Sequence, residues 1–522
     1  MPEQARERVF SPALELSGAL ASGFAGTGPD LAVAEPEADQ TDFDVIVVGA
    51  GLSGIGVGYH LQRDCPRKSF AILEARGAIG GTWDLFRYPG IRSDSDMYTL
   101  GYRFRPWHGE SSFADGASIL EYLRDTAREY GIDRKIRYRH KVMRASWSSS
   151  EARWQLEVSG PDGKALAFTC SFLQLCSGYY DYDAGYMPGW PGMDRFAGEI
   201  VHPQKWPDGL DYAGKRVVVI GSGATAVTMV PALTDKAAHV TMLQRSPTYI
   251  VARPAKDSVA SWLYSRLPER LAYALARWKN IFLQMYFYNA ARRKPEAAKE
   301  YIIELAEEEL GPGFDVEKHF TPRYNPWDQR LCLVPDGDLF KAIREGKASV
   351  VTDEIETFSE TGLKLRSGEE LPADIIVCAT GLVMRLMGGI ELLVDGRNVN
   401  PGATMIYRGV MLSDVPNLAL TFGYANASWT LKADLVAEYL CRILNKMDRD
   451  GYAFCTPRND PSIIPEATLP LSSGYMQRAK DMLPKQGSRR PWKLYQNYAK
   501  DVLSLRFGSI DDGVLTFTRR AG

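Results

Sequence analysis

Two glycine-rich turns constrain this chain more than any other feature. Gly49-Ala50-Gly51-Leu52-Ser53-Gly54 follows the run 44–48, and Gly221-Ser222-Gly223-Ala224-Thr225-Ala226 follows the run 215–220. Glycine lets the backbone turn tightly and approach a pyrophosphate, which then rests on the N-terminus of the next helix. Each turn therefore predicts a dinucleotide-binding βα unit. The predicted contact residues are Gly49, Gly51, Ser53, Gly54, Gly221, Gly223, Ala224 and Thr225.

The residue at the end of the following strand distinguishes the two ligands. The run 70–73 ends at Glu74, whose carboxylate would accept hydrogen bonds from ribose hydroxyls and repel a 2′-phosphate. The run 240–244 ends at Arg245-Ser246, where a guanidinium can pair with a 2′-phosphate. Arg245 could instead be an exposed arginine without a ligand. We expect FAD at the first site and NADPH at the second, with electrons passing between them.

Composition narrows the class of protein. The 522 residues include 45% hydrophobic and 24% charged residues, which is typical of a globular protein. The net charge of −2 gives no argument for nucleic-acid binding. Seven scattered cysteines without a CxxC pair argue against a disulfide framework, a dithiol reductase and a zinc ribbon, so no metal site is predicted. We expect a cytoplasmic protein.

Two segments bear on targeting and on membranes. Residues 1–41 lack the pattern of a secretory signal and predict a mobile extension. The lipophilic stretch 271–288 contains Arg277, Lys279, Asn280 and Gln284, so it falls short of a transmembrane span. Its aromatic residues and the basic run 292–294 leave peripheral membrane contact open. The favoured interpretation is a buried helix that lines a substrate entrance.

The order of these signals predicts an α/β fold with two Rossmann-like dinucleotide-binding domains, the NADP domain inserted in the FAD domain. After the extension, the first part of the FAD domain with its linker spans 42–211. The NADP domain spans 212–381 and includes a helical insertion at 258–310. The second part of the FAD domain spans 382–522, and its last helix starts near Ser428, whose hydroxyl is a candidate N-cap.

Between the two units, Phe196-Ala197-Gly198-Glu199-Ile200-Val201-His202-Pro203-Gln204-Lys205-Trp206-Pro207 resembles the FxGxxxHxxxWP signature of type I Baeyer–Villiger monooxygenases. Further matches are the segments 80–94, 327–331 and 423–432. They are most similar to the ethionamide-activating branch of that family found in mycobacteria. The resemblance extends from about residue 42 to the C-terminus.

The resemblance implies a chemistry. NADPH reduces FAD, O₂ gives a C4a-peroxyflavin, and a ketone is converted to an ester or lactone; sulfides and thioamides are further expected substrates. Arg330 is the implied catalytic cation beside the developing oxyanion, and Asp94 holds it in place. Further implied cofactor contacts are Thr82, Trp83, Tyr88, Asp94, Ser246, Gln329 and Ser428.

Two of the matched positions leave their roles open. His202 is a general base or, as we favour, part of a hinge between the domains. Gln329 stands where many family members carry a lysine that contacts the NADP phosphate, so the preference for NADPH over NADH is expected to be weaker.

Two other functions remain alternatives. One is an N- or S-oxygenating flavin monooxygenase without ketone activity. The other is a redox sensor that binds FAD and NADPH without turnover, against which Arg330 and Asp94 argue. The sequence leaves the physiological substrate, the oligomeric state and membrane association open.

Overall fold

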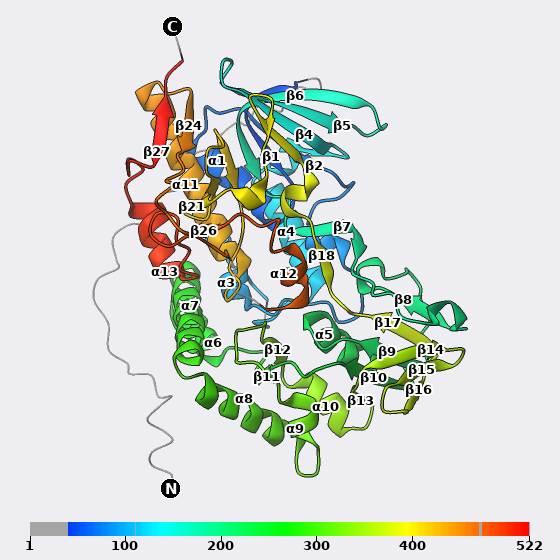
Figure 1. The fold of residues 1–522 in the computed structure, drawn as a ribbon. Coiled ribbons are helices and arrows are strands. Elements are labelled where there is room, and N and C mark those ends of the chain that lie inside the picture. Colours follow the sequence, from blue (N-terminus) through cyan, green and yellow to red (C-terminus); the bar gives the residue numbers. More distant parts are fainter. Residues whose placement is uncertain (1–39, 110, 469–471, 521–522) are drawn as a thin grey trace. The chain divides into compact units, whose positions relative to one another are not determined.

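The computed structural model describes residues 40–109, 111–468 and 472–520 (Figure 1). Most of the predicted extension, 1–39, lies outside the described residues. The two largest sheets of the described chain are a mixed sheet, in which β1 leads into the first glycine-rich turn, and a parallel sheet, in which β9 leads into the second. The first sheet has the order β20-β19-β4-β5-β6-β1-β2-β3, with β23 also paired to β6.

The parallel part of the first sheet surrounds β1. Val47 of β1 lies opposite Ile72 of β2 and Gln174 of β6, and both pairings are parallel. The antiparallel strands β4 and β5 extend the sheet beyond β6. The strands of this sheet are β1 (Asp42–Val48), β2 (Phe70–Glu74), β3 (Ile136–Tyr138), β4 (Lys141–Ser148), β5 (Arg153–Ser159), β6 (Ala165–Leu175), β19 (Glu391–Val394), β20 (Arg397–Asn398) and β23 (Leu418–Leu420).

The second sheet is parallel throughout, in the order β13-β10-β9-β17-β8. Its strands are β8 (Glu199–Val201), β9 (Arg216–Ile220), β10 (His239–Gln244), β13 (Ala348–Thr352) and β17 (Ile375–Cys378). We call the part of the chain built on the first sheet the first unit and the part built on the second sheet the second unit. Because β19 and β23 return to the first sheet after β17, the second unit is inserted in the first. The predicted fold class is therefore confirmed, whereas the exact domain boundaries remain a prediction.

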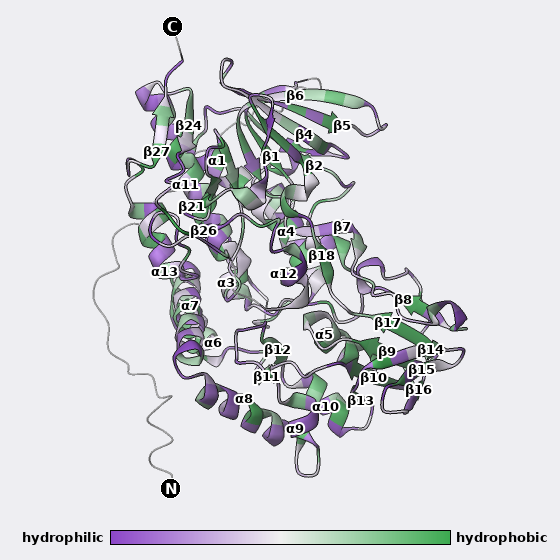
Figure 2. Cartoon of the chain, in the orientation of Figure 1, coloured by the Kyte–Doolittle hydropathy of each residue, from purple (hydrophilic) through white to green (hydrophobic). Residues whose placement is uncertain are grey.

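The central strands are apolar because helices cover both faces of a parallel sheet. Val45 and Val47 of β1, and Val217 and Val219 of β9, are buried. Figure 2 shows the same pattern as hydrophobic colouring along β9 and β17. The main helices are α1 (Leu52–Asp64), α2 (Thr82–Leu85), α3 (Met97–Leu100), α4 (Gly116–Glu129), α5 (Ala224–Leu233), α10 (Asp338–Arg344) and α11 (Trp429–Asp450).

The predicted helical stretch contains three helices and is followed by a fourth. They are α6 (Ser258–Arg266), α7 (Glu269–Arg293), α8 (Pro295–Leu310) and α9 (Val316–Phe320). The prediction that 271–288 is a buried helix is wrong in part. One face of α7 packs inward, but Leu271, Leu275, Phe282 and Tyr286 are exposed on the opposite face. No helix in the described ranges is long and apolar enough to cross a membrane.

Smaller elements complete the described chain. They are β7 (Tyr180–Gly185) with β18 (Leu382–Met384), β11 (Ile250–Arg253) with β12 (Cys332–Pro335), β14 (Ile355–Ser359) with β15 (Gly362–Leu365) and β16 (Glu370–Pro372), β21 (Ile406–Tyr407) with β22 (Met411–Leu412), β24 (Phe454–Pro457) with β27 (Leu515–Thr518), β25 (Pro465–Glu466) with β26 (Gln486–Gly487), and the helices α12 (Gly474–Ala479) and α13 (Tyr498–Asp501).

One strand lies across a predicted boundary. β8 pairs in parallel with β17 of the second sheet, with Ile200 opposite Ile376, although the sequence assigned 199–201 to the linker before residue 212. The run Glu199–Val201 is too short for its pattern to identify a strand, and the pairing comes from the edge that β17 offers. The HxxxWP segment therefore begins at the edge of the second sheet.

Candidate active site

The first glycine-rich turn has the geometry of a dinucleotide cradle. Gly49 has φ +103°, and a Cβ there would lie 2.6 Å from the carbonyl oxygen of Cys176, so a side chain is excluded. Gly51 occupies the N-cap of α1, which has no side-chain cap. A Cβ on Gly51 would meet Gly81 Cα at 3.6 Å, and Gly54 packs on Gly49. The uncapped N–H groups at the start of α1 and the close approach of the backbone at Gly51 and Gly81 fit a pyrophosphate.

Glu74 lies beside this turn at the end of β2. Its Oε2 accepts a hydrogen bond from Ala50 N (2.8 Å), and its Oε1 accepts one from Arg76 N (2.8 Å). Burial raises the pKa of the carboxyl above its ordinary value, and these backbone hydrogen bonds oppose that effect. Each oxygen keeps lone-pair capacity, so Glu74 fits the acceptor for ribose hydroxyls.

Helix α2 follows the close approach of Gly81 to Gly51. Thr82 Oγ1 lies 3.5 Å from Tyr182 Oη, and Trp83 is half-buried against the first hydrophobic core. The next residue, Asp84, is buried and accepts a hydrogen bond from Arg76 Nη2 (2.6 Å). This ion pair fixes the turn that precedes the predicted flavin contacts.

The second turn has the same geometry. Gly221 has φ +129°, and a Cβ there would lie 2.5 Å from the carbonyl oxygen of Ala379. A Cβ on Gly223 would meet nothing within 4 Å, and Ala224 begins α5 without a side-chain cap. Arg245 and Ser246 are exposed where β10 ends. The space beside Gly223 and the exposed guanidinium fit a dinucleotide with a 2′-phosphate.

Ser222 connects the second turn to the end of β10. Its hydroxyl donates to Ser246 O (3.3 Å) and lies 2.8 Å from Thr248 Oγ1. These contacts connect the predicted pyrophosphate-binding turn to the segment of the predicted 2′-phosphate contacts Arg245 and Ser246.

The segment 86–94 of the first unit contacts the second unit at three places. Tyr88 is buried against α5, where its hydroxyl lies close to Thr225 and Thr228. Arg92 is ion-paired with Asp338 on α10. Asp94 Oδ2 accepts a hydrogen bond from Arg330 Nη2 at 2.5 Å. The segment 86–94 of the first unit therefore places Asp94 beside Arg330 of the second unit.

Arg330 is accessible although it is ion-paired. Its side chain is 45% exposed, and that of Asp94 is 25% exposed. The Asp94 carboxylate raises the pKa of Arg330 further above its ordinary value, so the guanidinium is charged at any working pH. Gln329 is half-buried and forms a bridge with Pro326. An accessible, permanent cation fits the stabilisation of a developing oxyanion.

No signal in the sequence pointed to two sets of residues that support the site. Arg277 of α7 donates to Tyr98 O (2.7 Å) and Gly101 O (2.6 Å), which fixes the segment after Asp94. Arg277 had been interpreted only as an interruption of a lipophilic stretch. The second set consists of the tyrosines close enough to Arg330 to affect its pKa, namely Tyr179, Tyr180 and Tyr475. Their positions, far apart in sequence, gave no local signal.

Ser428 occupies the predicted N-cap position of α11, but its side chain does not cap the helix. Its hydroxyl lies 2.6 Å from Thr99 Oγ1 instead, because Thr99 offers a buried partner. The prediction of a side-chain cap is wrong. The adjacent Trp429 donates from Nε1 to Ser53 Oγ (2.9 Å), which connects the start of α11 to the first glycine-rich turn.

His202 lies at the crossing between the two units. Its Nε2 is 3.1 Å from Gly381 O, and its Nδ1 accepts a hydrogen bond from Gln204 N (3.2 Å). Burial lowers the pKa of the imidazole below its ordinary value. Both ring nitrogens are used by the backbone of the crossing segments, which favours the hinge over the general base.

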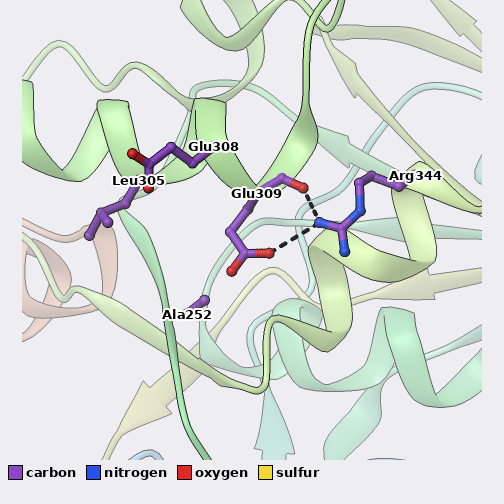
Figure 3. Close-up of a pocket in the computed structure, with 5 residues that line it drawn as sticks. All are labelled: Ala252, Leu305, Glu308, Glu309 and Arg344. Atoms are coloured by element: carbon purple, nitrogen blue, oxygen red, sulfur yellow. Dashed lines mark hydrogen bonds and ion pairs between the residues drawn. The ribbon is translucent and has the colours of Figure 1, made fainter.

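A cavity of about 330 Å³ lies elsewhere in the second unit (Figure 3). It is lined by Ala252, Leu305, Glu308, Glu309 and Arg344, and Arg344 Nη1 bonds Glu309 Oε2 at 3.1 Å. No predicted site residue lines it, so it has no part in the site at Arg330.

Comparisons with known proteins agree with this geometry. Residues 102–292 match the family model "Flavin-binding monooxygenase-like", and residues 47–114 match "NAD(P)-binding Rossmann-like domain". The chain is 56% identical over 479 residues to the FAD-containing monooxygenase EthA of Mycobacterium tuberculosis, covering 91% of this chain and 98% of EthA. It is 49% identical to the probable FAD-binding monooxygenase AlmA of Acinetobacter baylyi, covering 92% of this chain and 97% of AlmA.

A solved structure extends the likeness to the fold. An oxidised steroid monooxygenase bound to NADP matches 92% of this chain and 100% of its own, with a TM-score of 0.72 at 21% identity. The branch predicted from the sequence is confirmed by the EthA match. The chain belongs to the flavin-binding monooxygenase-like family, as an FAD- and NADP(H)-dependent monooxygenase related to EthA.

Proposed function

We propose that this monooxygenase inserts one oxygen atom of O₂ next to a ketone carbonyl, giving an ester or lactone, and that it also oxidises sulfides and thioamides. The observation that carries the proposal is the accessible Arg330 guanidinium, held by Asp94 at the junction of the two units. A sensor that only binds both dinucleotides needs no permanent cation at that place.

The two glycine-rich turns fit the two cofactors. FAD would lie on Gly49, Gly51 and the start of α1, with its ribose at Glu74. NADPH would lie on Gly221, Gly223 and the start of α5, with its 2′-phosphate at Arg245. When bound, the flavin takes a hydride equivalent from NADPH and activates O₂.

The residues of the chain then have separate tasks. Asp94 orients Arg330, and Arg330 stabilises negative charge on oxygen without donating its proton. Tyr88 and Arg92 hold the segment that carries Asp94 against α5 and α10.

The test is product analysis with isotopically labelled O₂. The purified protein, loaded with FAD, receives NADPH and either a cyclic ketone or a dialkyl sulfide. One labelled oxygen atom in an ester or lactone supports the proposal. Label in sulfoxide alone would favour the N- or S-oxygenating alternative, and NADPH oxidation without labelled product would contradict both.

We also propose that the exposed face of α7 contacts an anionic membrane surface. Leu271, Leu275, Phe282 and Tyr286 follow one another at helical spacing on this face, and Phe282 is 56% exposed. Trp262 of the packed helix α6 is 60% exposed. The exposed basic residues at the two ends of α7 are Arg266, Arg270, Arg292, Arg293 and Lys294. The basic residues would be attracted to anionic lipid headgroups, and the apolar side chains between them would enter the bilayer surface.

A further inference from the structure

An aromatic cluster connects the first glycine-rich turn to Arg330. Trp429 donates to Ser53 Oγ in the turn, and the ring of Tyr179 stacks on Trp429 with centroids 5.1 Å apart and planes at 18°. Phe422 packs beside both rings, 5.5 Å from Tyr179. The ring of Tyr179 is therefore held in place by its aromatic neighbours.

The hydroxyl of Tyr179 lies in the field of Arg330. Burial raises the pKa of Tyr179 to about 12, and the positive charge of Arg330 acts in the opposite direction. Tyr475, which precedes Met476 on α12, also acts on both Arg330 and Tyr179. Tyr179 and Tyr475 also pack against one small hydrophobic cluster, and the charge of the guanidinium reaches Tyr179.

The hydrogen bond within the cluster has a direction. The hydroxyl of Tyr180 donates to Tyr179 Oη at 2.8 Å. Tyr179 then accepts through its oxygen and retains its own proton. Among the described residues Tyr179 Oη donates no hydrogen bond, and the guanidinium of Arg330 is a donor that already pairs with Asp94. The Tyr179 hydroxyl near the Arg330 guanidinium can therefore donate a hydrogen bond to an oxygen atom of a bound ligand.

We infer that Tyr179 donates a hydrogen bond to the carbonyl oxygen of the substrate beside Arg330, and that Tyr180 supports this donor by pairing with its oxygen. The inference deepens the proposed ketone oxygenation and rests on it. It defines a substrate class, namely compounds whose reacting carbon carries a hydrogen-bond-accepting oxygen. Sulfides lack such an oxygen and would gain nothing from the hydroxyl.

The test compares two unreactive binding equilibria in the FAD-loaded protein without NADPH. One ligand is a six-membered lactam, whose carbonyl accepts hydrogen bonds, and the other is the cyclic sulfide of the same ring size. Affinities are measured by calorimetry for the unaltered protein and for Tyr179→Phe, which keeps the ring stack. Tyr452→Phe, which changes a tyrosine that packs against Phe517, is the matched control.

We expect Tyr179→Phe to weaken lactam binding about 3- to 10-fold, the usual effect of one lost neutral hydrogen bond. Sulfide binding should change less than about twofold, and Tyr452→Phe should change neither affinity. Unchanged lactam binding, equal weakening of both ligands, or no lactam binding by the unaltered protein would each overturn the inference. Because no turnover is involved, these results are independent of whether the labelled ester forms.

Discussion

Arg277 on α7 faces Asp434 on α11, with Nη2 3.6 Å from Oδ2 and both side chains almost fully buried. His60 on α1 approaches the other oxygen of Asp434 with its Nε2 at 3.7 Å. Arg277 also bonds the backbone of the segment that follows Asp94. A helix of the second unit is thereby anchored in the first, close to the residue that holds Arg330.

Arg277→Leu should destabilise the protein strongly. The substitution leaves the buried carboxylate of Asp434 without its guanidinium partner, a change that typically costs about 3–5 kcal/mol. Urea unfolding followed by tryptophan fluorescence measures the loss. Arg293→Leu removes an exposed arginine from the same helix and should change stability by less than about 0.5 kcal/mol. Similar losses in the two variants would show that the buried pair does not anchor α7.

The stability should also depend on pH through His60. Burial lowers the pKa of His60, but the carboxylates of Asp434, Asp64 and Glu438 raise it more, so the folded-state pKa lies above 6.5. The positive charges facing the cluster are Arg63, Arg103, Arg277 and Arg506.

A raised folded-state pKa means that the stabilisation is fully present below the unfolded pKa of 6.5 and is lost as the pH rises through the folded pKa. The stability difference between the unaltered protein and His60→Gln should therefore shrink from pH 6 to pH 9. The measurement is the urea midpoint of both proteins across that range. A difference that does not change with pH would contradict a charged His60 in the folded protein.

NADPH should be preferred over NADH because of Arg245. Arg245→Ala should weaken NADPH binding by roughly 1.5–3 kcal/mol, the usual loss for a hydrogen bond to a charged group, and leave NADH binding unchanged. Gln329 stands where many family members carry a lysine that contacts the NADP phosphate, so the expected preference is smaller than a lysine would give. Affinities for both dinucleotides, measured in the unaltered protein and the variant, decide the point. Equal affinities in the unaltered protein would refute the assignment.

The apolar face of α7 should bind anionic vesicles. The unaltered protein should sediment with vesicles that contain phosphatidylglycerol and not with neutral phosphatidylcholine vesicles, and binding should fall at high salt. Phe282→Ser with Trp262→Ser should abolish sedimentation without changing the FAD absorbance. Leu503→Ser, which alters another exposed apolar side chain, is the control. Retention of binding by the double variant would exclude this face as the contact.

The parts of the fold that depend on local sequence could be predicted. The turns at Gly49 and Gly221 encode the two Rossmann-like units, because only glycine fits where a Cβ would collide with Cys176 or Ala379. The same local signals, together with the motif that includes His202, predicted the family and the cofactors, which are confirmed. The individual site residues remain predictions until they are tested.

Features that depend on distant partners could not be predicted. Arg277 looks like an interruption of an apolar helix until Asp434 is placed beside it. Large apolar side chains lie on the exposed face of α7, whereas its buried face carries mainly alanines with Tyr273 and Ile281, so hydropathy did not identify which face is buried. The role inferred for Tyr179 depends on Trp429 and Arg330, which lie far away in the sequence. β8 belongs to the second sheet because it pairs with β17, and the sequence of a three-residue strand does not reveal its partner.

The most direct test of the account is coupled oxygenation by Arg330→Ala. Flavin reduction needs hydride transfer, whereas ketone oxygenation needs a stabilised negative charge on oxygen, and loss of one stabilising group typically costs about 10²–10³ in rate. The measurement is labelled ester formed from ¹⁸O₂ per NADPH oxidised, with H₂O₂ quantified in parallel. The account predicts that the variant binds FAD, loses ester formation, and releases the remaining oxidation as H₂O₂. Ester formation at a near-normal, coupled rate would contradict the role assigned to Arg330.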